Sequence, residues 1–255
     1  MKKRIFTLML SVLFVLGLVA CGNKQEERPA GNTESEPAVS AQPEENVETE
    51  KTAEPEDGES SEAAGNPQTE DGKTLVVYFS MPETTNPENM NAEEEYSTVV
   101  IDGEVLGNTQ YVAYVIQENT GADIFRIEPV TPYPMNHAEL EEVATEEKRN
   151  DAMPEIVAEV ENIEQYDTIF LGYPNWYADM PRIIYSFLDQ YDLSGKTIVP
   201  FVTSGGSGFS NTISTIADLE PDANVITDGL SISRNVVQDA EADIIEWVEG
   251  LGLSK

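Results

Sequence analysis

The stretch Leu75-Val76-Val77-Tyr78-Phe79-Ser80 decides the fold, together with Gly107-Asn108-Thr109-Gln110, which follows after a long acidic interruption. The first is an apolar run that ends in a hydroxyl side chain, as expected of a strand buried on both faces. The second places a glycine and polar residues before a helical pattern, which is typical of a helix start. Together they predict one strand-loop-helix unit whose loop is split by residues 81–106.

Short apolar runs and helical patterns alternate along the remainder of residues 73–255. Strands are predicted at 75–79, 124–127, 168–172, 197–202 and 224–232. Helices are predicted at 109–118, 137–147, 180–191, 211–219 and 236–251. This alternation predicts an α/β fold with a doubly wound, five-stranded parallel sheet and helices on both faces.

Three strand ends carry unusual loops, and ligands of such sheets bind at the carboxyl ends of the strands. A helix start offers N–H donors and a positive dipole end, so Ser80 with Asn108, Thr109 and Gln110 predicts a phosphate site. A simple helix cap at Asn108 or Thr109 explains the same residues. The sequence of this loop alone fits both a phosphate site and a helix cap.

The other two loops have features suited to a flat ring. Residues 174–181 hold adjacent aromatics, Trp176 and Tyr177, between two prolines, although core packing would also explain them. Ser204 is followed by Gly205, Gly206 and Gly208, and glycines allow main chain to approach a ring closely or to form an ordinary turn.

The order of several motifs resembles the flavodoxin family. They are Tyr78-Phe79-Ser80, Gly107-Asn108-Thr109, Thr120-Gly121-Ala122-Asp123, Pro132-Tyr133-Pro134, Gly172-Tyr173-Pro174-Asn175-Trp176 and Gly205-Gly206-Ser207-Gly208. The resemblance covers residues 73–255 and is strongest to bacterial members with an insertion in the phosphate loop. It implies strand order 2-1-3-4-5 and one noncovalent FMN.

The same resemblance implies a set of cofactor-binding residues. They are Ser80, Met81, Asn108, Thr109, Gln110, Pro174, Asn175, Trp176, Tyr177, Ala178, Asp179, Ser204, Gly205, Gly206 and Gly208. The chain departs from the family at Tyr177-Ala178-Asp179, where similar proteins often have a second Trp followed by Gly. Thr84-Thr85-Asn86 could also pass for phosphate ligands, but Pro87 follows and no helix begins there, which favours Thr109.

Composition excludes several other functions. A net charge of −34 argues against nucleic-acid binding. One His and one Cys cannot build the usual zinc site, so no metal is expected. Phe209 replaces the last glycine of a nucleophile elbow around Ser207, and His137 precedes that serine, which disfavours a serine hydrolase. We expect His137 to be exposed and the seven acids of 81–106 to point outward.

The N-terminus predicts export. Basic residues 2–4 precede an apolar run at 5–20, and Leu18-Val19-Ala20-Cys21 resembles a lipoprotein lipobox. We therefore expect a signal peptide at 1–20, a lipid on Cys21, a disordered acidic linker to residue 72, and an extracytoplasmic domain on the cell membrane. An ordinary cleaved signal and an uncleaved anchor are the alternatives.

These predictions favour an electron-transfer protein whose partner is a redox protein or a small-molecule electron donor or acceptor. No side chain is an evident catalytic acid, base or nucleophile. An FMN-dependent NAD(P)H or quinone-type oxidoreductase is one alternative, with residues 81–106 forming part of a substrate pocket. A flavin-free surface interaction module on the same scaffold is the other.

Overall fold

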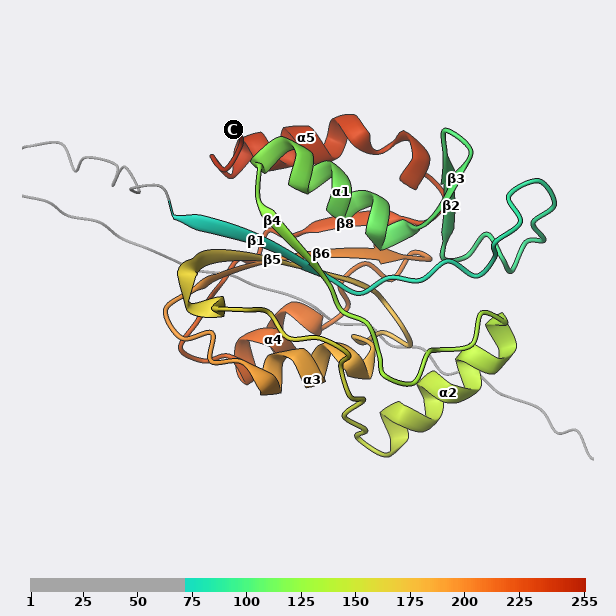
Figure 1. The fold of residues 1–255 in the computed structure, drawn as a ribbon, viewed down its shortest axis with the longest axis horizontal. Coiled ribbons are helices and arrows are strands. Elements are labelled where there is room, and N and C mark those ends of the chain that lie inside the picture. The colour runs from blue at the N-terminus through green and yellow to red at the C-terminus, as the bar shows by residue number, and fades with distance from the viewer. Residues whose placement is uncertain (1–71) are drawn as a thin grey trace, which may run out of the picture. The chain divides into compact units, whose positions relative to one another are not determined.

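The computed structural model describes residues 72–255, and the predicted signal peptide, Cys21 lipidation and linker lie outside them. A parallel sheet runs in the order β4-β1-β5-β6-β7, with β8 also pairing with β6 (Figure 1). Its strands are β1 (Lys73–Tyr78), β4 (Asp123–Arg126), β5 (Tyr166–Pro174), β6 (Thr197–Ser204), β7 (Asn224–Val225) and β8 (Leu230–Ser233). The predicted flavodoxin-like order 2-1-3-4-5 is confirmed.

The last edge strand is interrupted where a single strand over 224–232 was predicted. β7 pairs with the start of β6 and β8 with its end. In β6, the carbonyls of Lys196, Ile198 and Ser204 accept hydrogen bonds from N–H groups of the edge segment. Because backbone groups alternate in direction along a strand, those of Pro200 also face the edge segment. Proline has no N–H to donate, and the ladder breaks opposite Pro200.

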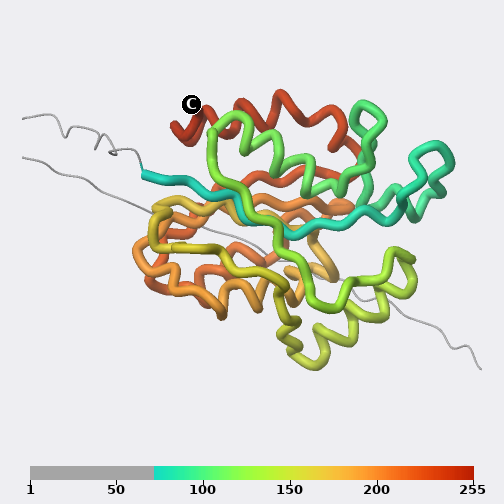
Figure 2. Tube along the Cα trace, in the orientation of Figure 1, coloured from blue at the N-terminus to red at the C-terminus, as the bar shows by residue number. Residues whose placement is uncertain are grey.

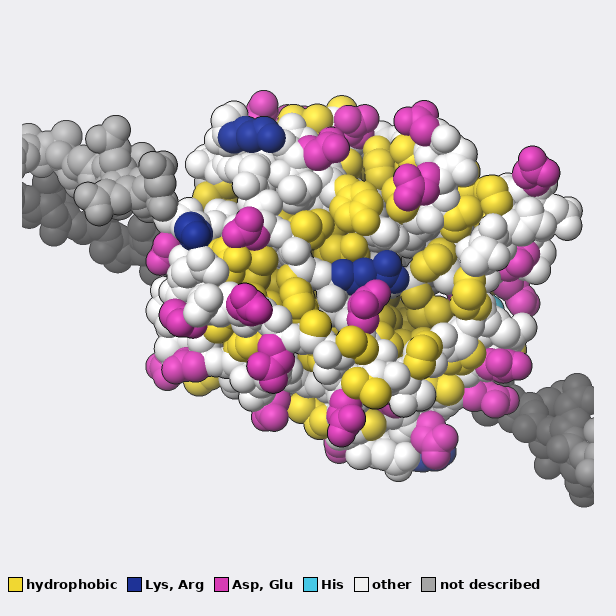
Figure 3. Space-filling model, in the orientation of Figure 1, with side chains coloured by type: hydrophobic (Ala, Val, Ile, Leu, Met, Phe, Trp, Pro, Cys, Tyr) yellow, Lys and Arg dark blue, Asp and Glu magenta, His cyan; other side chains and the backbone are white. Residues whose placement is uncertain are grey.

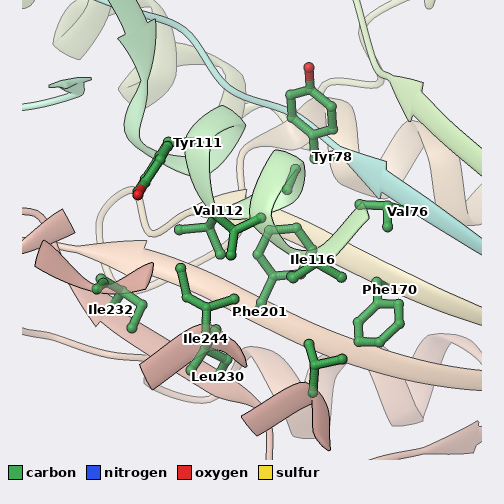
Figure 4. Close-up of a cluster of buried hydrophobic side chains, with 14 of the residues drawn as sticks. Val76, Tyr78, Tyr111, Val112, Ile116, Phe170, Phe201, Leu230, Ile232 and Ile244 are labelled. Atoms are coloured by element: carbon green, nitrogen blue, oxygen red, sulfur yellow. The ribbon is translucent and has the colours of Figure 1, made fainter. Parts of the chain in front are cut away.

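Helices cover both faces of the sheet (Figure 1). α1 (Asn108–Thr120) and α5 (Glu241–Gly250) lie on one face, and α3 (Arg182–Gln190) and α4 (Thr212–Leu219) on the other. The alternation of β1 divides the core accordingly: Val76 and Tyr78 pack on the α1 side, whereas Leu75, Val77 and Phe79 pack on the α3 side. Figure 4 shows Val112 and Ile116 of α1 meeting Ile244 of α5 over the sheet.

The split loop is more ordered than a solvated flap. Residues 98–107 form an antiparallel hairpin of β2 (Thr98–Ile101) and β3 (Glu104–Gly107), which turns at Asp102 and Gly103, both with positive φ. Val99 and Leu106 are buried against the α1 side of the core. Figure 2 shows the insertion leaving the end of β1 and returning directly into α1.

The remaining elements are α2 (His137–Arg149) and two 3-10 turns, η1 (Ile163–Gln165) and η2 (Val237–Asp239). η2 and α5 together replace the single helix predicted over 236–251. Within residues 72–255, no helix is long and apolar enough to cross a membrane. Acidic side chains are spread over the face drawn in Figure 3, with few basic ones among them.

Candidate functional site at the carboxyl edge of the sheet

A cavity of about 160 Å³ lies at the carboxyl ends of β1, β5 and β6. Ten of the predicted cofactor-binding residues line it: Ser80, Met81, Asn108, Thr109, Pro174, Asn175, Trp176, Tyr177, Ser204 and Gly205. The structure therefore brings all three predicted loops to one place.

The two halves of the split phosphate loop are in contact. A Cβ on Gly107 would overlap the Ser80 hydroxyl oxygen, so only glycine allows this approach. The Thr109 hydroxyl, at the start of α1, lies 2.7 Å from that of Thr203 at the end of β6. Ser80 is 3% exposed and Thr109 is 1% exposed. Two hydroxyls and the first turn of a 13-residue helix thus share one buried corner.

Asn108 is fixed at the same helix start. Its backbone N–H donates to the Ser97 carbonyl and its Nδ2 donates to the Tyr96 carbonyl. Because the Tyr96 carbonyl can only accept, this bond fixes the amide orientation. The other amide atom, Oδ1, is buried and has no hydrogen-bond partner among residues 72–255. A buried acceptor of this kind is suited to a hydroxyl donor from a ligand.

Gln110 does not line the cavity. Its Oε1 accepts the Gly107 N–H at 3.1 Å and its Nε2 donates to the Tyr114 hydroxyl. The side chain therefore caps the helix.

The second loop is a tight turn in which two residues have an unusual backbone conformation. Tyr177 and Ala178 have φ of 54° and 59°, and Trp176 and Asp179 exchange backbone hydrogen bonds across them. Positive φ at both central positions is the geometry in which glycine or asparagine is usual. Similar proteins often have a second Trp followed by Gly here, whereas this chain forms the turn with two non-glycine residues in the left-handed region.

Trp176 packs against the core and also reaches the cavity. Its ring packs edge-on against Phe79 and Tyr133 of the core, and it also lines the cavity. Its neighbour Tyr177 is 48% exposed. The loop therefore presents an aromatic wall supported by the core.

Asp179 and Ala178 lie outside the cavity wall. Asp179 accepts hydrogen bonds from the Met180 N–H and the Tyr185 hydroxyl and pairs with Lys148 of α2 at 3.1 Å. Lys148 also donates to the Tyr177 carbonyl. This carboxylate positions the loop, and its contact with a cofactor stays a prediction.

The third loop is organised by Ser204. Its hydroxyl accepts hydrogen bonds from the N–H groups of Gly206 and Gly208, and neither of these two glycines lines the cavity. Asn175 joins the second loop to the third, because its N–H donates to the Thr203 carbonyl and its Nδ2 to the Gly208 carbonyl.

The cavity wall also contains an ionisable pair that was not predicted from the sequence. Glu83, predicted to point outward, is buried, and its Oε1 lies 2.7 Å from Nδ1 of His137, which was expected to be exposed. Burial raises the pKa of the Glu83 carboxyl, and the bond from His137 opposes that shift. Glu88, Glu93, Glu95, Asp102 and Glu104 are exposed as expected, and Glu94 is half-buried.

Further missed residues complete the wall: Tyr96, Ser97, Leu140, Glu141, Ala144, Thr203 and Arg234. The Tyr96 ring meets His137 edge-on and carries the Arg234 guanidinium on its face, 3.9 Å from the ring centre. These contacts join segments that are distant in sequence. No group of His, Cys, Asp and Glu in residues 72–255 is arranged to hold a metal ion.

The fold and this edge define a doubly wound α/β protein with a cavity at the point where helix α1 begins. A family profile described as Flavodoxin matches residues 97–251, more than half of the chain. The chain belongs to the flavodoxin family.

Two solved structures, with TM-scores above 0.5, agree with this assignment. A proposed flavoprotein from Bacteroides eggerthii is 28% identical, with a TM-score of 0.52, over 71% of this chain and 99% of that one. A second, from Bacteroides uniformis, is 25% identical, with the same TM-score, over 70% and 98%. A Lactobacillus acidophilus flavoprotein in complex with FMN is 20% identical, with a TM-score of 0.48, over 67% and 99%. A search of curated proteins returned no match.

Proposed function

We propose that this chain binds FMN at the carboxyl edge of the sheet and transfers electrons. The observation that carries the proposal is the contact between Ser80 and the glycine that begins α1. It places a hydroxyl beside helix N–H groups that have no intrahelical partner, and phosphate groups bind at such positions.

The rest of the cavity suits the other parts of this cofactor. The unpaired Oδ1 of Asn108 would accept a hydrogen bond from a ribityl hydroxyl. Trp176 offers a flat apolar ring in the cavity wall. A bound FMN supplies one- and two-electron chemistry, while the protein supplies binding and electrostatics.

A reductase with its own substrate is the second candidate. The pair of Glu83 and His137 in the cavity wall favours it, since a histidine beside a carboxylate can hold and release a proton. Steady-state oxidation of NADH or NADPH with a quinone acceptor would distinguish a reductase from a carrier, which should show none.

We further propose that the domain works outside the cytoplasm on a lipid attached to Cys21. The lipobox-like sequence supports this. Metabolic labelling with a fatty-acid analogue tests it: labelling should disappear in Cys21→Ala.

Titration of the full chain with FMN tests the binding proposal. Flavin fluorescence should be quenched and the visible spectrum should shift. Thr109→Val removes a hydroxyl with little change of volume and should weaken FMN binding by roughly tenfold, the value of one hydrogen bond to a charged group. Thr120→Val, at the other end of α1, is the matched control and should bind normally. Unquenched flavin with the native chain would exclude the proposal.

A further inference from the structure

Arg234 is the one Lys or Arg that lines the cavity within residues 72–255. It directly follows β8, and its backbone N–H donates to the Ser204 carbonyl at 2.8 Å. The protein holds 48 acidic residues and 14 basic ones, yet no ion pair of the described residues includes Arg234. The guanidinium is close enough to the Glu83 carboxyl to lower the pKa of that group, but the two form no direct ion pair.

The side chain of Arg234 contacts two loops. Its guanidinium lies over the ring of Tyr96, from the insertion, and a Cβ on Gly205 would come within 3.1 Å of the guanidinium carbon. Stacking on an aromatic face leaves the N–H groups in the guanidinium plane free to bind an anion. These contacts fix the position of the guanidinium and leave its N–H donors free.

The other charged groups in the cavity wall are mostly carboxylates, so a bound anion depends on this guanidinium for attraction. The other acidic or imidazole side chains in the wall are Glu83, Glu141 and His137. Both carboxylates lie near His137, with Oε1 of Glu83 at 2.7 Å from Nδ1 and Oε1 of Glu141 at 3.6 Å from Nε2. Without Arg234, a phosphate dianion would enter a cavity with two carboxylates and one histidine.

Arg234 and Thr109 contact adjacent residues at the end of β6. The Arg234 N–H donates to the Ser204 carbonyl, and the Thr109 hydroxyl lies 2.7 Å from the Thr203 hydroxyl. Arginine binds phosphate through two parallel hydrogen bonds, and these charge-assisted bonds are among the stronger ones in proteins.

We propose that Arg234 selects phosphorylated flavin: its guanidinium binds the phosphate of FMN and offsets Glu83 and Glu141, so that FMN is preferred over riboflavin. This inference rests on the proposed function of the cavity. Tyr96 acts through Arg234 as a positioning residue.

Paired titrations with FMN and with riboflavin test the inference, using the full chain and flavin fluorescence. In Arg234→Gln the Kd for FMN should rise roughly 10- to 100-fold, while the Kd for riboflavin changes less than about threefold. Arg234→Met, which keeps a long apolar stem against Tyr96, should give the same selective loss. It replaces Arg234→Gln if that variant does not fold.

Arg149→Gln is the matched control for charge. Arg149 is exposed and ends α2, twelve residues and therefore about 18 Å along the helix from His137. Its loss should leave both Kd values unchanged.

An unchanged FMN Kd in both Arg234 variants, or an equal loss for FMN and riboflavin, would overturn the role of Arg234 alone. A native chain that binds neither flavin would overturn the proposed function as well.

Discussion

Replacing Gly107 by alanine tests the contact between the two halves of the split loop. Gly107 has φ −74° and ψ 148°, which alanine adopts freely, so the substitution acts on the folded state through the contacts of the new Cβ and not through backbone strain. The new Cβ would overlap the Ser80 hydroxyl oxygen and would lie 3.1 Å from the backbone N and C of Met81. The hydroxyl can rotate away, but the backbone of Met81 must shift by a few tenths of an ångström.

The expected cost follows from these distances. Overpacking of a buried site costs typically about 1–3 kcal/mol, and the lower entropy of unfolded alanine returns about 0.4–1 kcal/mol. We expect Gly107→Ala to lower the free energy of unfolding by about 1–2 kcal/mol, measured by urea denaturation. FMN affinity should fall as well, because Ser80 is displaced from the helix start.

A double-mutant cycle with Ser80→Ala isolates the contact. Removing the hydroxyl removes the worst overlap, so Gly107→Ala should cost about 1 kcal/mol less in that background than in the native chain. Gly250→Ala is the matched control, since a Cβ there meets nothing within 4 Å. Additive costs within about 0.3 kcal/mol, or a Gly107→Ala variant as stable as Gly250→Ala, would refute the reasoning.

Three further predictions concern the aromatic wall, the strained turn and a buried carboxyl. Trp176→Leu should weaken FMN binding by roughly three- to tenfold in a fluorescence titration, because Trp176 lines the cavity. Trp247→Leu, at the other tryptophan, on α5, should leave binding unchanged. Equal effects of the two variants would contradict the placement of FMN against Trp176. Ala178→Gly should raise the free energy of unfolding by about 0.5–1 kcal/mol, because Ala178 has a φ of 59°, and a loss of stability in urea would count against strain in this turn. Burial, with a smaller contribution from Asp192, raises the pKa of Glu220 to about 7, so its ionisation removes stability as pH rises from about 4.5 through 7. In thermal unfolding, Glu220→Gln should therefore raise the free energy of unfolding by on the order of 1 kcal/mol at pH 8, after allowance for solvent screening. At pH 4 it should give no gain, and a gain there would contradict the raised pKa of Glu220.

The main elements of the fold could be predicted from the sequence because they rest on local patterns. Residues 75–79 form a buried strand and a helix begins beside Thr109, as their apolar runs and capping residues indicated. The β2–β3 hairpin was missed, although Asp102-Gly103 is a hairpin-turn dipeptide. The seven acidic residues of the insertion were interpreted as a solvent-exposed segment, so no strand was predicted there.

The ionisable part of the cavity could not be predicted in the same way. Glu83 and His137 are 54 residues apart, and neither lies in a motif that points to the other. Arg234 reaches the cavity only because the edge strand resumes as β8 after the break at Pro200 and ends beside Ser204. Such contacts follow from the three-dimensional path of the chain and carry no local pattern.

The most direct measurement of the central claim is a crystal structure of the chain grown with FMN. We expect one FMN per chain, with its phosphate within hydrogen-bond distance of the Ser80 and Thr109 hydroxyls and its ring against Trp176. A flavin bound elsewhere, or crystals in which this cavity holds no flavin at saturating FMN, would contradict it.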